Sequence, residues 1–154
     1  MNIEDKIGKF LCDSNISISI AESLTGGLVC GRIVNYPGIS KVFKEGVVAY
    51  SVESKIRRLN VSPETIELYT DVSEETAIEM AKGIALISGS RIGVSTTGNA
   101  GPEGDPVGLV YIGIYIDGRT STYKSYIDGN RQEIRNKVVD IVLDKLFEKI
   151  KGIE

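Results

Sequence analysis

A serine followed closely by two glycines is the first candidate for chemistry in this chain. Ser23 lies in the run Ala21-Glu22-Ser23-Leu24-Thr25-Gly26-Gly27, directly after alternating isoleucines that predict a strand over residues 16–20. N–H groups at the start of a helix have no partner within that helix and can face an anion. Ser23 is therefore a candidate nucleophile beside an oxyanion or phosphate site. The other interpretation, which the spacing alone favours, is a cap of the following helix.

A tyrosine and a lysine form the second candidate pair. Tyr50 falls at the end of a predicted strand, and Lys55 lies one turn into the helix that follows it. A partly buried lysine can lose its charge and act as a base, and it can lower the pKa of a neighbouring phenol. In the alternative interpretation, Tyr50 belongs to the rim of the core and Lys55 to a solvated face.

The third candidate is a glycine-rich loop at the end of another predicted strand. It reads Thr96-Thr97-Gly98-Asn99-Ala100-Gly101-Pro102, and such a loop can fold its N–H groups around an anion. It lacks the lysine and hydroxyl residue of a P-loop and does not match a dinucleotide-binding fingerprint. A tight loop without a ligand is an equal alternative.

Two arginines on the last predicted helix could bind an acidic group. Arg131 and Arg135 are one helical turn apart, so both can project from one face. The alternative is a solvated helix start.

The absence of histidine restricts the possible mechanisms. Without histidine, Ser-His-Asp and Cys-His catalysis are excluded, and Lys, Tyr, Asp, Glu or a thiol must move any protons. Cys12 and Cys30 lack the spacing of a zinc site and are interpreted as buried free thiols. We expect no metal and no cofactor, with a carboxylate-bound magnesium as the alternative.

The composition indicates one globular domain over residues 1–154. The chain has 154 residues, of which 42% are hydrophobic and 25% charged, which is enough for a real core. Its net charge of −3 has no long block of one sign, so nucleic acid is not the expected partner. No apolar run is long enough to span a membrane and no signal peptide is recognisable. A cytoplasmic protein acting on a small molecule is expected.

The hydrophobic periodicity predicts alternating strands and helices. An α/β fold follows, a three-layer α/β/α sandwich with a mixed, mostly parallel sheet. Asp117-Gly118 indicates a hairpin, and the two glycine-rich turns after strands predict the walls of one site. The predicted helices are 2–14, 25–35, 51–59, a short one from 62, 73–89 and 131–150, and the predicted strands are 16–20, 42–50, 91–96, 107–116 and 121–127.

Assembled in order, these motifs resemble the CinA C-terminal domain family, which includes nicotinamide-nucleotide amidases. The resemblance covers nearly the whole chain. Its motifs are residues 21–27, Tyr36-Pro37-Gly38, residues 46–51 with Lys55, residues 72–75, Thr97-Gly98 with Ala100-Gly101-Pro102, residues 106–113, and residues 131–135.

The resemblance implies deamidation of nicotinamide mononucleotide to nicotinate mononucleotide and ammonia. It assigns Ser23 as the nucleophile, with Tyr50 and Lys55 as the groups that activate it. It also implies that the loop formed by Thr97, Gly98, Asn99 and Gly101 helps to hold the nucleotide. A homodimer is expected from the family alone.

The mechanism hypothesis is acyl transfer through Ser23. Backbone donors near Thr25, Gly26 and Gly27 are the candidates for an oxyanion site. For the substrate phosphate, the helix start ranks first and Arg135 second.

The chain departs from the family pattern in the nucleotide-facing loop. Asn99 replaces a common apolar residue, and residues 103–105 are shorter than the usual segment. A non-catalytic nucleotide-binding or regulatory module therefore stays an alternative, as does hydrolysis of another amide. Many relatives also carry an N-terminal domain that this sequence lacks, so only the amidase-type half is inferred.

Overall fold

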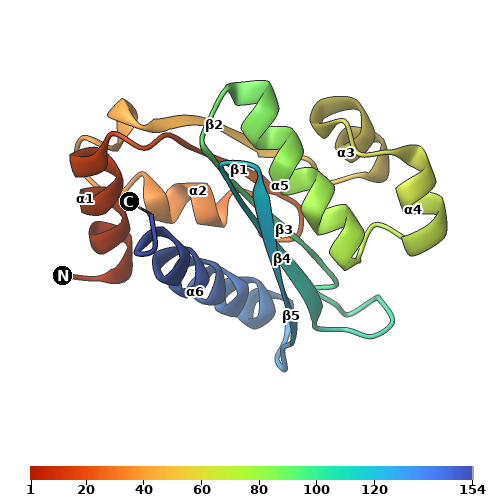
Figure 1. Cartoon of the computed structure of the whole chain (residues 1–154). Coiled ribbons are helices and arrows are strands. Elements are labelled where there is room, and N and C mark those ends of the chain that lie inside the picture. Colours follow the sequence, from red (N-terminus) through yellow and green to blue (C-terminus); the bar gives the residue numbers. More distant parts are fainter. Residues whose placement is uncertain (154) are drawn as a thin grey trace.

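Residues 1–153 are described by a computed structural model (Figure 1). Helices and strands alternate along the chain and end in a strand hairpin followed by one long helix. The helices are α1 (Ile3–Ser14), α2 (Leu28–Ile33), α3 (Val52–Leu59), α4 (Pro63–Tyr69), α5 (Glu74–Ser88) and α6 (Arg131–Ile150), with a 3-10 turn η1 (Ile39–Lys41). The strands are β1 (Ile18–Glu22), β2 (Phe43–Val48), β3 (Ile92–Gly98), β4 (Leu109–Ile116) and β5 (Arg119–Tyr126).

The sheet is mixed, as predicted. Its strand order is β2-β1-β3-β4-β5; β1 pairs in parallel with β2 and β3, whereas β4 is antiparallel to both β3 and β5. Four strands therefore run in one direction and β4 alone opposes them. The antiparallel pair comes from the predicted hairpin, where Asp117 and Gly118 have φ values of 49° and 94°.

Helices cover both faces of the sheet, which confirms the three-layer arrangement. Helices α1, α2 and α6 pack on one face and contribute the larger core, and α5 covers the other face with α3 and α4 beside it (Figure 1). No helix within residues 1–153 is long and apolar enough to cross a membrane.

The strand β1 begins at Ile18, two residues later than predicted, and the alternation of Ile and Ser exposes neither of its faces. All five of its residues are buried, since β1 is an inner strand covered on both faces. The Ser19 hydroxyl is satisfied by the hydroxyl of Ser90 at 2.7 Å. A polar residue at a strand position therefore does not imply solvent when a partner hydroxyl lies opposite.

Helix α5 approaches the sheet closely because two strand positions carry glycine. A Cβ atom on Gly93 would lie 2.1 Å from the Ala81 carbonyl oxygen, and one on Gly113 would lie 2.5 Å from that of Ala77. The Ser95 hydroxyl donates to the same Ala77 oxygen at 2.7 Å. This close packing sets the position of the start of α5, which borders the site described below.

The Gly93→Ala substitution should destabilise the protein strongly. The added methyl group would collide with backbone that cannot move without displacing α5, and the expected loss is about 3 kcal/mol in the free energy of unfolding. Chemical denaturation measures it. Gly31→Ala is the control: Gly31 lies in α2 with nothing within 4 Å of an added Cβ, so its stability should be unchanged or higher. Equal stability of the two variants would contradict the close-packing argument.

Candidate active site

Ser23 lies in a tight turn directly after β1. Its N–H group donates to the Thr96 carbonyl oxygen at 3.1 Å and lies 3.2 Å from the Thr96 hydroxyl. That hydroxyl is also 2.8 Å from the hydroxyl of Thr25. The buried threonine of β3 thus fixes both ends of the turn, and Ser23 keeps 7% of its surface exposed.

The side chain of Lys55 reaches Ser23 from helix α3. Its Nζ lies 2.8 Å from Ser23 Oγ and donates to the Tyr50 carbonyl oxygen at 2.9 Å. The Ser23 hydroxyl lies 3.4 Å from the same carbonyl oxygen. Lys55 has no exposed surface, so the interpretation of a solvated helix face is wrong for this residue.

Burial changes the protonation of Lys55. It lowers the pKa of the ammonium group below its usual value, because the charged form loses solvation, while the negative charge of Asp71 partly opposes this effect. The neutral amine therefore forms at a lower pH than on an exposed lysine. A neutral amine can accept the proton of the adjacent serine hydroxyl.

The chain positions Lys55 through the start of α3. Ser51 caps the helix by accepting a hydrogen bond from the Ser54 N–H at 3.0 Å, as its position after a strand predicted. Leu59 is buried one turn after Lys55, so both belong to the face of α3 that points inward. A lysine is tolerated on this buried face because the Ser23 hydroxyl and the Tyr50 carbonyl form hydrogen bonds with its amino group.

The helix after Ser23 is shorter than predicted, and its start is already occupied. Gly26 and Gly27 have φ values of 57° and 106°, so the chain turns there and α2 begins only at Leu28. The fully buried carboxylate of Glu22 accepts the N–H groups of Val29 and Cys30, both at 2.9 Å. This corrects the expectation that the helix start receives a substrate phosphate: a side chain of the chain itself fills that position.

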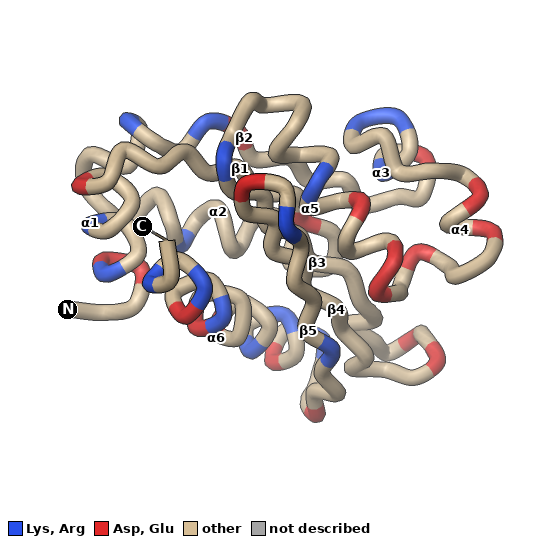
Figure 2. Tube along the Cα trace, in the orientation of Figure 1, with Lys and Arg blue, Asp and Glu red and all other residues tan. Residues whose placement is uncertain are grey.

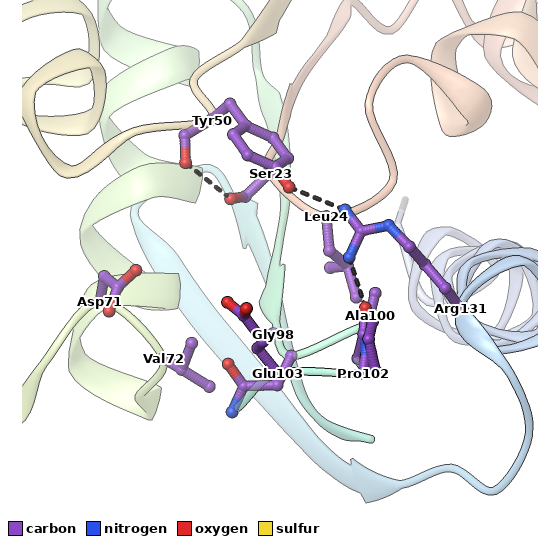
Figure 3. A pocket seen from close by; sticks show the side chains of 12 residues that line it. Ser23, Leu24, Tyr50, Asp71, Val72, Gly98, Ala100, Pro102, Glu103 and Arg131 are labelled. Carbon is purple, nitrogen blue, oxygen red and sulfur yellow. Dashed lines mark hydrogen bonds between the residues drawn. The ribbon is translucent and has the colours of Figure 1, made fainter. Parts of the chain in front are cut away.

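Tyr50 takes part in the site differently from the expectation. Its phenol oxygen accepts a hydrogen bond from Arg131 Nη2 at 2.9 Å, while its main-chain carbonyl lies against the Ser23 hydroxyl (Figure 3). The same carbonyl accepts a hydrogen bond from Lys55. Among the described residues, the phenol oxygen therefore makes its hydrogen bond with Arg131 and none with Ser23. Its predicted part in activating Ser23 stays a prediction, and it requires the phenol to leave Arg131.

The two arginines of α6 have different positions. Arg135 Nε donates to the Leu24 carbonyl at 2.8 Å, and its Nη2 lies 3.3 Å from the Thr25 carbonyl. Arg135 thus binds the carbonyl groups of the serine turn and is not among the residues that line the cavity over Ser23. Arg131 lines that cavity and donates to the Gly101 carbonyl at 2.6 Å. The sequence showed both arginines, but only the structure shows which one faces the site.

A cavity of about 520 Å³ opens over Ser23, between the serine turn and the glycine-rich loop (Figure 3). Gly98, Asn99 and Gly101 line it as expected from the two-loop prediction, whereas the buried hydroxyl of Thr97 donates to the Asp71 carbonyl at 2.6 Å. Several lining residues received no site role from the sequence, although most of them lie within the motifs quoted above, because their types carry no chemistry by themselves or their position depends on the fold: Leu24, Asp71, Val72, Ala100, Pro102 and Glu103.

Metal binding and thiol chemistry have less support than the serine and lysine pair among the described residues. Within residues 1–153, no group of three or more His, Cys, Asp or Glu side chains is placed to hold a metal ion. Cys12 and Cys30 are free and partly buried. Burial and the neighbouring Glu22 raise the pKa of the Cys30 thiol, so it is a poor nucleophile.

Comparison with known proteins gives one consistent family. The model of the CinA C-terminal domain matches residues 1–150. A competence-damage inducible protein of Clostridium tetani is 57% identical over 148 residues, covering 94% of this chain and 36% of that protein. Its counterpart in Clostridium acetobutylicum is 53% identical and covers 97% of this chain and 37% of that protein. The chain thus spans little more than a third of the length of these relatives.

Solved structures have the same fold. Competence damage-inducible protein A from Klebsiella pneumoniae superposes with a TM-score of 0.95 at 29% identity, covering 99% of this chain and 97% of the other. A competence or damage-inducible protein from Enterobacter asburiae gives a TM-score of 0.93 at 34% identity, with 96% of each chain covered.

The Glu22→Gln substitution tests the cap beneath the serine turn. An amide offers one acceptor where the carboxylate offers two, and its NH₂ group would face a backbone N–H in a buried place. We expect a loss of about 2 kcal/mol in the free energy of unfolding, measured by denaturation. Glu53→Gln on the exposed face of α3 is the control and should change little. A fully stable Glu22→Gln protein would show that the cap is not needed to hold the turn.

Proposed function

The chain belongs to the CinA C-terminal domain family, and from this premise we propose that it is an amidase that converts nicotinamide mononucleotide into nicotinate mononucleotide and ammonia. The resemblance supplies the substrate, and the site geometry supports the reaction class. The observation that carries the proposal is the 2.8 Å contact between Lys55 Nζ and Ser23 Oγ at the base of a cavity. It joins a nucleophile to a base in a chain without histidine.

The reaction proceeds in two halves. Ser23 Oγ attacks the carboxamide carbon as its proton passes to neutral Lys55, which then gives a proton to the departing ammonia as the C–N bond breaks. Water attacks the resulting ester, Lys55 takes a proton from that water, and the acid leaves as the serine regains its hydrogen. Atoms and charges balance without a cofactor or metal.

The serine turn supplies donors for the oxyanion of the tetrahedral intermediate. Among residues 1–153, no acceptor is found for the N–H groups of Leu24, Thr25 and Gly27, whereas the Gly26 N–H donates to the Ser23 carbonyl at 3.0 Å. Free N–H groups held next to a nucleophile stabilise developing negative charge without rearrangement. Arg135 keeps this turn rigid by binding the carbonyls of Leu24 and Thr25, so their N–H groups stay fixed.

Arg131 is the candidate for the phosphate of the nucleotide. It is the cavity-lining residue with a permanent positive charge, and a guanidinium binds phosphate through two parallel hydrogen bonds. The two groups expected from the sequence to bind the phosphate are already occupied: the start of α2 by the Glu22 carboxylate, and Arg135 by backbone carbonyls. Phosphate binding would require Arg131 to release the Tyr50 phenol or the Gly101 carbonyl.

Loss of either partner of the serine and lysine pair should abolish ammonia release. In Ser23→Ala no acyl-enzyme can form, and in Lys55→Met the base is removed while an apolar chain fills its buried place. We expect turnover of nicotinamide mononucleotide to fall by about a hundredfold to ten-thousandfold in each variant. Coupled detection of ammonia measures this, with Lys82→Met on the exposed side of α5 as the control.

The outcome separates the candidate functions. Unchanged turnover in Ser23→Ala would exclude the serine mechanism. Saturable binding of the nucleotide with no product would instead favour the non-catalytic module, which the altered loop at Asn99 keeps open.

The pH dependence should report the buried lysine. Because burial lowers the pKa of Lys55, kcat/KM should rise with pH through a midpoint below 10.5 and be lost as pH falls through that midpoint. Initial rates across a pH series measure the midpoint. In Lys55→Arg the guanidinium stays charged, so activity should be absent at every pH. An ascending limb that persists in Lys55→Arg would assign the titrating group elsewhere.

A further inference from the structure

Asp71 is an acid of the cavity wall that the mechanism above does not use. It lies between α4 and α5 and lines the cavity together with Ser23. Within residues 1–153 no ion pair or hydrogen bond engages its carboxylate, whereas its main-chain carbonyl accepts a hydrogen bond from the Thr97 hydroxyl. Its carboxylate is thus available to a ligand.

The turn that carries Asp71 is held firmly. The preceding Thr70 has a φ of 69°, a backbone conformation unfavourable for a β-branched residue. Its carbonyl accepts hydrogen bonds from the hydroxyls of Ser73 at 3.0 Å and Thr76 at 2.7 Å. The Asp71 carbonyl is held in addition by the Thr97 hydroxyl. Together these hydrogen bonds fix the backbone of Asp71, and with it the point from which its side chain extends, although Asp71 is not part of the core.

Asp71 and Arg131 lie on opposite sides of Ser23 (Figure 3). The cavity is therefore lined by two acids, Asp71 and Glu103, and by one cation, Arg131, which lies across the nucleophile from Asp71. The acidic character extends beyond the cavity, because acidic residues gather along α4, the start of α5 and the loop after β3 (Figure 2). A ligand that fits this field carries opposite charges at its two ends, with the reacting group between them.

We propose that Asp71 makes this cavity selective for a ligand whose ring is positively charged and whose far end is anionic. The inference rests on the proposed function, in which the substrate ring is a pyridinium cation and the phosphate is the anionic end. The product of that reaction carries an added carboxylate, which Asp71 repels.

The same charge links binding to the base. Asp71 raises the pKa of Lys55 in the free protein, against the effect of burial. A cationic ring placed beside Asp71 offsets that negative field.

A pair of ligands that differ in ring charge tests the proposal by equilibrium binding. Nicotinamide mononucleotide has a cationic ring, whereas its dihydro form has a neutral ring with the same carboxamide, ribose and phosphate. The Ser23→Ala protein allows calorimetric titration without turnover. We expect the Ser23→Ala protein to bind the cationic form more tightly than the neutral form. In the double variant with Asp71→Asn, that preference should fall by roughly fivefold to tenfold.

Two matched variants make the test specific to charge at this position. Asp71→Glu keeps the charge and should keep the preference, whereas Asp144→Asn removes an exposed acid of α6 and should leave the preference unchanged. A preference that is equal in Asp71→Asn and its parent would overturn the proposal. So would a loss of affinity for both ligands by the same factor, because a purely structural role of Asp71 does not distinguish ring charge.

Ammonia release separates this proposal from the proposed function. Turnover of nicotinamide mononucleotide with no effect of Asp71→Asn on the ratio of kcat/KM between the two ligands would overturn the inference and keep the amidase. Charge-selective binding that depends on Asp71, without ammonia release, would keep the inference and overturn the amidase. Failure to bind either ligand would overturn both.

Discussion

The contact between a buried lysine and a serine hydroxyl is the constraint on which the rest of this structure depends. Lys55 has no exposed surface and, among residues 1–153, no carboxylate within hydrogen-bonding distance, so burial disfavours its charged form. Its hydrogen-bond partners in the described part of the chain are the Ser23 hydroxyl and the Tyr50 carbonyl, both of them uncharged. The fold therefore tolerates a costly residue at the position where a base is useful, as functional sites often do.

Three neighbouring elements hold the serine side of this contact. Thr96 of β3 binds the backbone of Ser23, Glu22 caps α2 below the turn, and Arg135 of α6 binds the carbonyls of the turn. Thr96 and Arg135 come from distant parts of the sequence, whereas Glu22 directly precedes Ser23, and none of the three lines the cavity. They leave the N–H groups of the turn few ways to move, which is the condition for electrostatic stabilisation of an oxyanion.

The cavity and the buried pair are connected through charge. Asp71 lines the cavity and its field reaches Lys55, while Arg131 joins the Tyr50 phenol to the glycine-rich loop on the other side. Because Tyr50 also offers its carbonyl to Lys55, a ligand that displaces Arg131 acts on a residue in contact with the base. The residues that line the cavity and the buried pair of Lys55 and Ser23 thus form one network.

The sequence by itself determined the alternation of strands and helices, the hairpin at Asp117 and the position of Ser23 after a strand, because periodicity and turn residues act locally. It did not determine the length of α2, where the positive φ of Gly26 and Gly27 delays the helix, or the burial of both faces of β1. The tertiary structure alone decided that Lys55 is buried, that Arg131 rather than Arg135 faces the cavity, and that Glu22 occupies the helix start. The first two depend on which distant segments meet, and the third on the turn at Gly26 and Gly27 that brings Glu22 onto the start of α2. Residue types and their spacing along the chain do not specify these contacts.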